Sequence, residues 1–190
     1  MLRAAAIERK EVGKVRRLVI KSALAVFVIL ALFFALEAGL AFAQEKIKVS
    51  FRQTHATVKS EYLEIGDVKG HYAGFRHYEG AMEVIEGPKA LEGAQITGVS
   101  QGDTIQGNGS AHGYTKAVKG PNSIVMKWEL QVRTSTSPEG TPVMTYEGPF
   151  TFIKGTGEFE GIQGGGTIKG KYISKNISIT EPEGEYWIEK

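Results

Sequence analysis

The chain has 190 residues, with 23 basic and 21 acidic side chains and no cysteine. Seven of the basic residues and three of the acidic ones precede residue 44, which leaves 16 basic and 18 acidic residues in the rest of the chain. This balance excludes nucleic-acid binding, which needs clustered Lys and Arg to neutralise phosphates. The lack of cysteine excludes disulfides, thiolate-metal sites and reactive-thiol chemistry.

The first predicted element is an export segment. Basic residues within positions 14–21 precede an uninterrupted apolar run from Ala23 to Leu36, and Ala41 and Ala43 form a small-x-small cleavage site. Cleavage at this site makes Gln44 the first residue of the mature protein.

An uncleaved membrane anchor is the alternative, because residues 22–43 are as long as the roughly 20 apolar residues that cross a bilayer. In both cases the basic flank stays in the cytoplasm and the rest of the chain is exported, so it is periplasmic or secreted. We therefore expect a leader with a signal peptide or inner-membrane anchor helix over residues 1–43 and one domain over residues 44–190. Only the uncleaved segment would contact a membrane.

The clearest strand of the exported part runs from Ile124 to Arg133. Apolar residues, Trp128 among them, occupy one parity, while Lys127 and Glu129 belong to the other. A period of two places these sets on opposite faces of a sheet. One buried face and one wet face are typical of antiparallel sheets.

Other short apolar stretches between glycines and prolines predict further strands. These are Ile47–Phe51, Tyr72–Tyr78, Met82–Glu86, Ala94–Val99, Thr104–Tyr114, Met144–Ile153, Gly165–Ser174 and Ser178–Ile188. An open sheet of about nine strands would expose two edges, so closure into a barrel is expected, with a two-sheet sandwich as the alternative. The predicted fold class is all-β: one antiparallel, closed or nearly closed barrel of about eight strands.

A cluster of glycines lies between the last predicted strands. Sharp turns, bulges or close approach of neighbouring backbones at a barrel corner explain such a cluster. Its members are Gly155, Gly157, Gly161, Gly164, Gly165 and Gly166. A phosphate-binding loop is disfavoured, because the spacing differs from the dinucleotide fingerprint and no Gly-Lys-Ser/Thr follows.

Residues 155–170, GTGEFEGIQGGGTIKG, resemble the G-T-G-x-F-x-G-I-x-G-G-G-T-x-x-G signature of bacterial exported proteins with an allene-oxide-cyclase-like barrel. Residues 65–71, IGDVKGH, are similar to the G-D-x-x-G-H element near the start of that domain. Plant allene oxide cyclases and dirigent proteins share this barrel, with a shorter version of the glycine element. The resemblance implies a fold more strongly than an activity.

One predicted strand offers two alternative inward faces. His71, Phe75 and His77 share one parity; Tyr72 and Tyr78, with an arginine between them, share the other. Inward histidines would move protons or bind a metal, whereas the other face would supply phenols and a guanidinium. The two histidines lie about 20 Å apart along a strand, too far for one metal ion, so no metal site is predicted and rim or surface histidines are favoured.

The aromatic side chains suggest the function. Most belong to the core, but a few, Trp128 among them, would line an apolar pocket with a small number of polar groups. The leading prediction is therefore a barrel that binds a small, mainly apolar ligand.

The resemblance implies a second function, a cofactor-free cyclase or isomerase, whose catalytic residues this sequence does not identify. A self-associating structural barrel without a cavity is the third alternative. The plant relatives are oligomers, so the resemblance also implies a possible homo-oligomer, whether the barrel has an enzymatic or a structural role.

Overall fold

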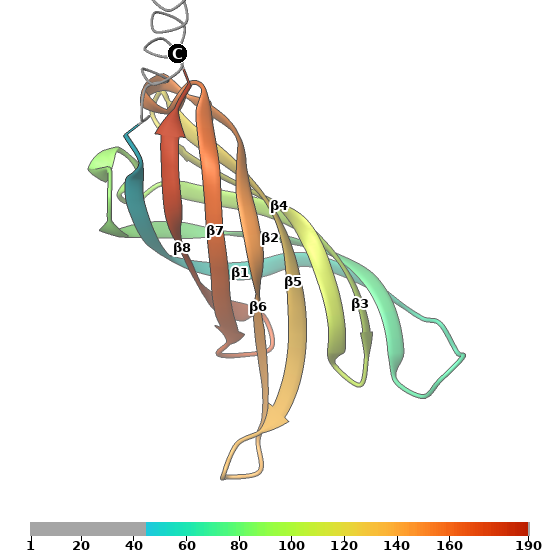
Figure 1. The fold of residues 1–190 in the computed structure, drawn as a ribbon. Helices are drawn as coiled ribbons and strands as arrows, with labels where there is room; N and C mark the ends of the chain where they lie inside the picture. Colours follow the sequence, from blue (N-terminus) through green and yellow to red (C-terminus); the bar gives the residue numbers. More distant parts are fainter. Residues whose placement is uncertain (1–44, 190) are drawn as a thin grey trace, which may run out of the picture. The chain divides into compact units, whose positions relative to one another are not determined.

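The computed structural model describes residues 45–189, so the predicted export segment and its cleavage site at Ala41, Ala43 and Gln44 lie outside the described residues. Eight antiparallel strands form a closed barrel in which each strand pairs with its neighbours in sequence and β1 pairs with β8 (Figure 1). The strands are β1 (Ile47–Glu64), β2 (His71–Glu86), β3 (Gln95–Ile105), β4 (Asn108–Lys119), β5 (Asn122–Thr136), β6 (Pro142–Thr156), β7 (Ile162–Tyr172) and β8 (Ile177–Ile188). The predicted all-β antiparallel barrel is confirmed.

β5 shows why these sequences form barrel strands. Ile124, Met126, Trp128 and Leu130 are buried, and the residues after the last three are exposed. Successive side chains point to opposite faces of a strand, so this alternation places one set inside the barrel and the other in solvent.

Three predicted strand boundaries are wrong. The segments around Tyr78 and Met82 belong to one strand, because Gly80 is not a turn: a Cβ there would lie 2.1 Å from the Thr54 carbonyl oxygen, so the glycine permits close strand approach. The predicted strand Thr104–Tyr114 is divided between β3 and β4. Gln106 and Gly107 interrupt it, because both have positive φ, as a two-residue hairpin turn of type I′ requires. β1 continues far beyond its predicted end at residue 51.

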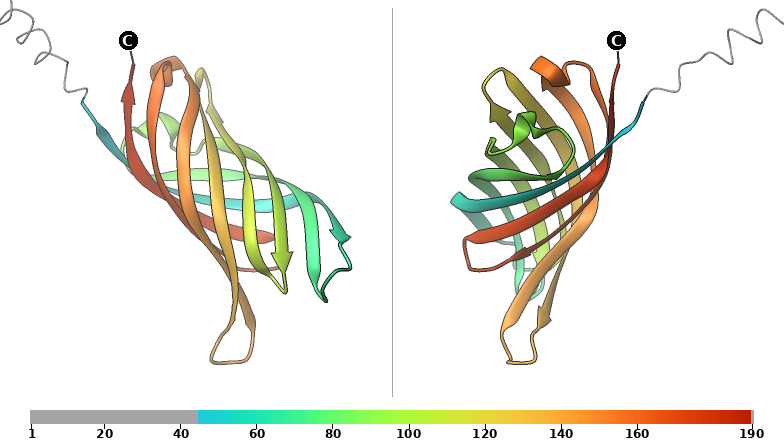
Figure 2. Two further views of the ribbon diagram at one scale, coloured as in Figure 1. Left: turned by 45° about the vertical axis from the view of Figure 1, so that its right-hand side comes forward. Right: turned by 90° about the vertical axis from the view of Figure 1, so that its left-hand side faces the viewer.

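The two ends of the barrel differ. The closed end carries the short 3₁₀ helices η1 (Lys89–Leu91) and η2 (Gly157–Phe159) and lies on the same side as the end of β8 (Figure 2). The open end carries the β1–β2, β3–β4, β5–β6 and β7–β8 turns, of which the β5–β6 hairpin projects farthest in Figure 2.

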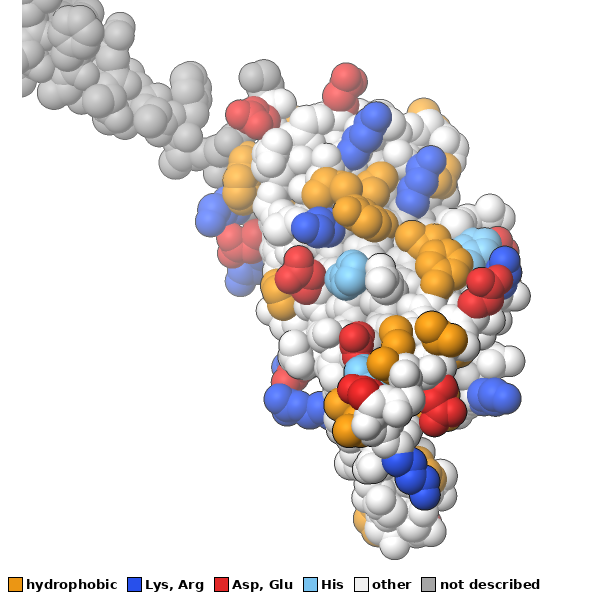
Figure 3. Space-filling view, turned by 90° about the vertical axis from the view of Figure 1, so that its right-hand side faces the viewer, with side chains coloured by type: hydrophobic (Ala, Val, Ile, Leu, Met, Phe, Trp, Pro, Cys, Tyr) orange, Lys and Arg blue, Asp and Glu red, His pale blue; other side chains and the backbone are white. Residues whose placement is uncertain are grey.

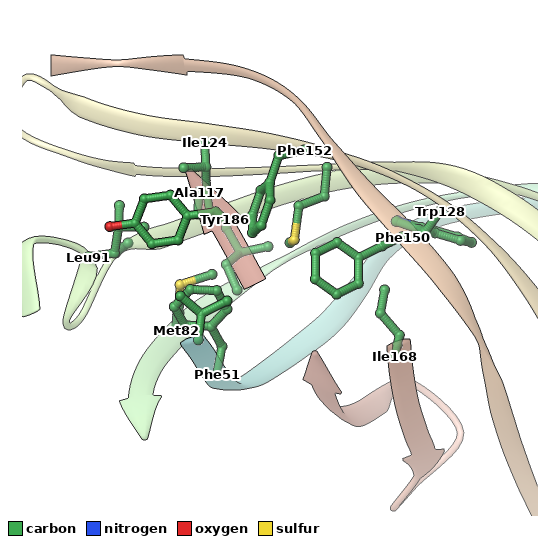
Figure 4. Close-up of a cluster of buried hydrophobic side chains, with 14 of the residues drawn as sticks. Phe51, Met82, Leu91, Ala117, Ile124, Trp128, Phe150, Phe152, Ile168 and Tyr186 are labelled. Carbon is green, nitrogen blue, oxygen red and sulfur yellow. The ribbon is translucent and has the colours of Figure 1, made fainter. Parts of the chain in front are cut away.

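The apolar core fills the closed half. Leu91 from η1 and Phe159 from η2 are 0% and 2% exposed, and they pack with barrel residues such as Phe51, Met82 and Ile124 in one cluster (Figure 4). Fully burying a side chain of this size contributes about 1.5–3 kcal/mol, so the two helices act as apolar plugs at this end.

The glycine cluster surrounds η2 and continues into β7. Gly157 and Gly161, with φ of 64° and 76°, make the turns on either side of Phe159. Gly165 and Gly166 serve close contact instead: a Cβ would lie 2.2 Å and 2.0 Å from carbonyl oxygens of β6 and β8. Any larger residue would push the strands apart.

Glycine also makes room for rings inside the barrel. A Cβ on Gly98 would lie 2.1 Å from the Tyr78 ring, and one on Gly170 would lie 2.3 Å from the Tyr146 ring. Each tyrosine ring therefore lies over the glycine that faces it on the neighbouring strand.

We expect Gly98→Ala to lower the free energy of unfolding by about 1–3 kcal/mol, because the methyl group and the buried Tyr78 ring cannot occupy the same space. Gly102→Ala, on the same strand, is the matched control, since its Cβ would meet nothing closer than 3.8 Å. Urea unfolding of both variants measures the difference, and equal stabilities would contradict the packing argument.

Candidate functional site

A cavity of about 460 Å³ occupies the open half of the barrel. All eight strands contribute to its lining, which is mostly apolar and aromatic with a few polar groups. This size falls within the range of small-molecule sites, about 300–1,000 Å³.

The first polar cluster in the cavity joins β2, β4 and β5. The hydroxyl groups of Tyr78 and Thr115 lie 2.7 Å apart, and Trp128 Nε1 donates a hydrogen bond of 3.0 Å to the same threonine oxygen. The phenol and the indole are thereby held in fixed orientations, and their aromatic faces remain available to the cavity.

The second polar cluster joins β1, β6 and β8. His55 Nε2 lies 2.8 Å from Thr180 Oγ1 and its Nδ1 lies 3.0 Å from Ser178 Oγ, while Tyr146 Oη lies 2.7 Å from the same Thr180 oxygen. The His55 ring also packs against Tyr78, with 4.6 Å between ring centroids. The two clusters are thus in contact.

Burial keeps these groups uncharged at neutral pH. Desolvation, with a second contribution from the positive charge of Arg76, lowers the pKa of His55 from 6.5 to about 4. Burial raises the pKa of Tyr78 to about 12 and also raises the pKa of Tyr146. The polar groups therefore act as neutral hydrogen-bonding partners.

Arg76 supplies the positive charge of the lining. Its Nη2 and Nε donate hydrogen bonds of 2.7 Å and 3.2 Å to Tyr62 Oη, and its guanidinium carbon lies 4.9 Å from the centroid of the Tyr172 ring. This geometry is that of a cation–π contact.

Gln53 on β1 is a buried polar residue of the cavity lining. It is 2% exposed, and its Nε2 has no hydrogen-bond partner among the described residues. An unsatisfied buried amide costs about 1–3 kcal/mol. This is the one such side-chain atom in residues 45–189.

Some of the predicted ligand-binding residues line the cavity and others do not. Tyr72, Tyr78 and Trp128 line the cavity, and Phe75 borders it while being 42% exposed. The tyrosine and arginine parity of β2 is therefore the inward one. The histidines of the other parity do not line the cavity.

Those two histidines lie beside carboxylates instead. His71 Nδ1 lies 2.6 Å from Asp67 and its Nε2 lies 2.8 Å from Asp103, which ties the β1–β2 turn to the end of β3. His77 lies 3.7 Å from Glu79. The hydrogen bonds that His71 donates to Asp103 and to Asp67 raise its pKa above 6.5, with the bond to Asp103 contributing most.

Sequence reasoning missed several residues of the cavity, namely Gln53, His55, Thr115, Ser178 and Thr180. The available signal was strand parity: position 51 is an apolar inward residue, and every second residue from there to Thr57 on β1 also faces inward. Because these residues are polar, the hydrophobic alternation that marks a strand ends there.

Exposed apolar side chains lie on the outer face of β1–β4. They include Leu63, Val99 and Tyr114. On the face seen in Figure 3, hydrophobic side chains form separate groups with charged side chains and histidines between them. Self-association through this face stays a prediction.

Within residues 45–189 no group of three or more His, Asp or Glu side chains is arranged to hold a metal ion. No helix in the same range has the length and apolar character needed to cross a membrane.

No family model and no curated protein matches the chain. Among solved structures, the chain is similar to the pterocarpan synthase dirigent protein PsPTS1, with 12% sequence identity, a TM-score of 0.43, and coverage of 78% of this chain and 99% of that one. It is also similar to the pterocarpan synthase dirigent protein GePTS1, with 13% identity, a TM-score of 0.42, and coverage of 79% and 88%.

We expect the stability of the barrel to fall as the pH drops from 6.5 to 4. In this window the unfolded chain takes up a proton on His55 that the folded barrel excludes, so the free energy of unfolding decreases by about 3 kcal/mol. His55→Gln should remove this part of the pH dependence. Urea unfolding at several pH values measures it, with the exposed His112→Gln as control; an unchanged profile in His55→Gln would contradict the assignment.

His71 should behave in the opposite way. Because its folded pKa is raised, its ion pairs stabilise the barrel below pH 6.5 and lose their effect as the pH rises through that folded pKa. An NMR titration should give a pKa above 6.5 in the wild type and a lower one in Asp103→Asn. Glu129→Gln, which removes an exposed carboxylate elsewhere, should leave the pKa of His71 unchanged. A wild-type pKa of His71 below 6.5 would refute its contacts with the two aspartates.

Proposed function

We propose that this protein is an exported barrel that binds a small, mainly apolar ligand in the open half of its interior. The observation that carries the proposal is the cavity of about 460 Å³, lined by Tyr78, Trp128, Tyr146 and other rings with few polar groups. Sites for small molecules have this composition, in which apolar walls supply affinity and sparse polar groups fix orientation.

Binding is favoured over proton-transfer catalysis by the titration of the cavity groups. An efficient general acid or base has a pKa near the working pH. His55, with a pKa of about 4, and Tyr78, with a pKa of about 12, are both far from neutrality. No carboxylate of the described residues lines the cavity either.

Export is the part of the proposal that rests on the sequence alone. The basic flank, the apolar run from Ala23 to Leu36 and the Ala41-x-Ala43 pattern support it. The intact mass of the protein recovered from the exported fraction would show whether it begins at Gln44 or keeps the segment as an anchor.

The binding test uses N-phenyl-1-naphthylamine, a neutral apolar dye that fluoresces when it leaves water. We expect saturable binding to the exported protein and a rise in thermal stability with dye concentration, because a ligand of the folded state stabilises it by mass action. Ala111→Phe places a ring in the cavity and should weaken binding about ten-fold or more, since one or two displaced apolar contacts are worth that much.

His112→Phe is the matched control. It puts the same ring on the same strand one residue away, on the outer face. Binding should survive in this variant. No dye binding by the wild type, or equal losses in the two variants, would overturn the proposal and favour a structural barrel.

A further inference from the structure

The arginines of residues 45–189 differ in their partners. Arg52 pairs with Glu83 and Glu181, and Arg133 pairs with Glu147. Arg76 has no carboxylate within ion-pair distance among the described residues, although it alone of the three lines the cavity. The cavity therefore has one fixed positive charge without a counter-charge.

We propose that the natural ligand is a small aromatic anion, whose apolar ring system lies against the cavity rings and whose single carboxylate or similar group binds Arg76. This inference rests on the proposed function and names the chemical class of its ligand. Three observations carry it: the free edge of the guanidinium, the charge balance of the lining, and the kind of side chains opposite.

The guanidinium has unused donors. Nε and Nη2, which lie along one edge of the group, donate to the hydroxyl of Tyr62, and the ring of Tyr172 covers one face. Nη1 has no hydrogen-bond partner among the described residues, so the edge between Nη1 and Nη2 still presents parallel N–H groups. That edge matches the two oxygens of a carboxylate.

The charge balance excludes a cationic ligand and favours an anion. The lining contains no Asp or Glu, and His55 is neutral because of burial and the nearby Arg76. A charge that is partly removed from water is costly unless an opposite charge compensates it. A bound anion would supply that compensation, whereas a neutral ligand would leave the cost in place.

The walls favour an aromatic body over an aliphatic chain. Tyr78 and Trp128 are fixed by Thr115, and Tyr146 is fixed by Thr180, so rings with set orientations surround the space. Fixed rings interact with a ligand ring in offset or edge-to-face arrangements, which adds about 0.5–1.5 kcal/mol per pair beyond burial of area.

The experiment compares two dyes with almost the same apolar body. 8-Anilinonaphthalene-1-sulfonate carries one negative charge, and N-phenyl-1-naphthylamine lacks it. The wild type should bind the anionic dye about ten-fold more tightly than Arg76→Gln does, which is the scale of one charge-assisted hydrogen bond. Affinity for the neutral dye should be equal in both proteins, which also shows that the cavity of the variant is intact.

Arg76→Lys and Arg133→Gln complete the set. The lysine variant keeps the charge and should keep part of the preference for the anion, whereas Arg133→Gln removes an exposed arginine outside the cavity and should change nothing. Ala111→Phe should abolish the signal of the anionic dye, which would place that dye inside the barrel.

The outcomes separate the two proposals. If neither dye binds, the proposed function fails. If the neutral dye binds but Arg76→Gln leaves the affinity for the anionic dye unchanged, the function stands and the inference about the ligand is wrong. Displacement of the bound dye by 2-naphthoate at lower concentration than by decanoate is expected; the reverse order would refute the aromatic body.

Discussion

The whole barrel depends on β1 pairing with two partners. Ile47 to Ala56 form the ladder with β8 that closes the sheet, and the ladder with β2 extends along most of the same strand. Without the first ladder the sheet would have two open edges, which are difficult to keep soluble. The pairing of β1 with β8 thus converts a meander of hairpins into an enclosed interior.

The same strand also creates the opening. Its register with β2 shifts between Thr57 and Lys59, and its ladder with β8 ends at Ala56, so the rest of β1 runs on beside β2 alone. A bulge bends a strand and increases its twist. Tyr62 lies beyond this point, where it meets Arg76. Closure and cavity mouth are therefore two consequences of one bent strand.

The sequence predicted the fold well where the interior is apolar and poorly where it is a cavity. In β5 the alternation through Trp128 identifies both the strand and its inward face, and the barrel follows from the number of such segments. Along β1, Gln53, His55 and Thr57 face inward but are polar, so the pattern disappears at the residues that line the cavity. A functional interior breaks the rule by which strands are recognised.

Side-chain partners were beyond prediction for a different reason. The link of His55 to Thr180 joins β1 to β8, which pair only when the barrel closes, and the link of Tyr78 to Thr115 joins two strands that are separated by β3. The resemblance in the glycine segment indicated the architecture, yet of the described residues that line the cavity the segment contains Ile168 alone. It identifies how the chain turns, and it leaves the contents of the interior open.

The division of the interior into two halves has a consequence for how such a barrel can change over time. Each strand contributes to the apolar plug with one stretch and to the cavity with another, as Phe51 and His55 do on β1. Stability resides chiefly in the first stretch and selectivity in the second. Residues around the mouth can therefore be substituted with little loss of stability, so that one barrel can acquire new ligands through a few substitutions at a time.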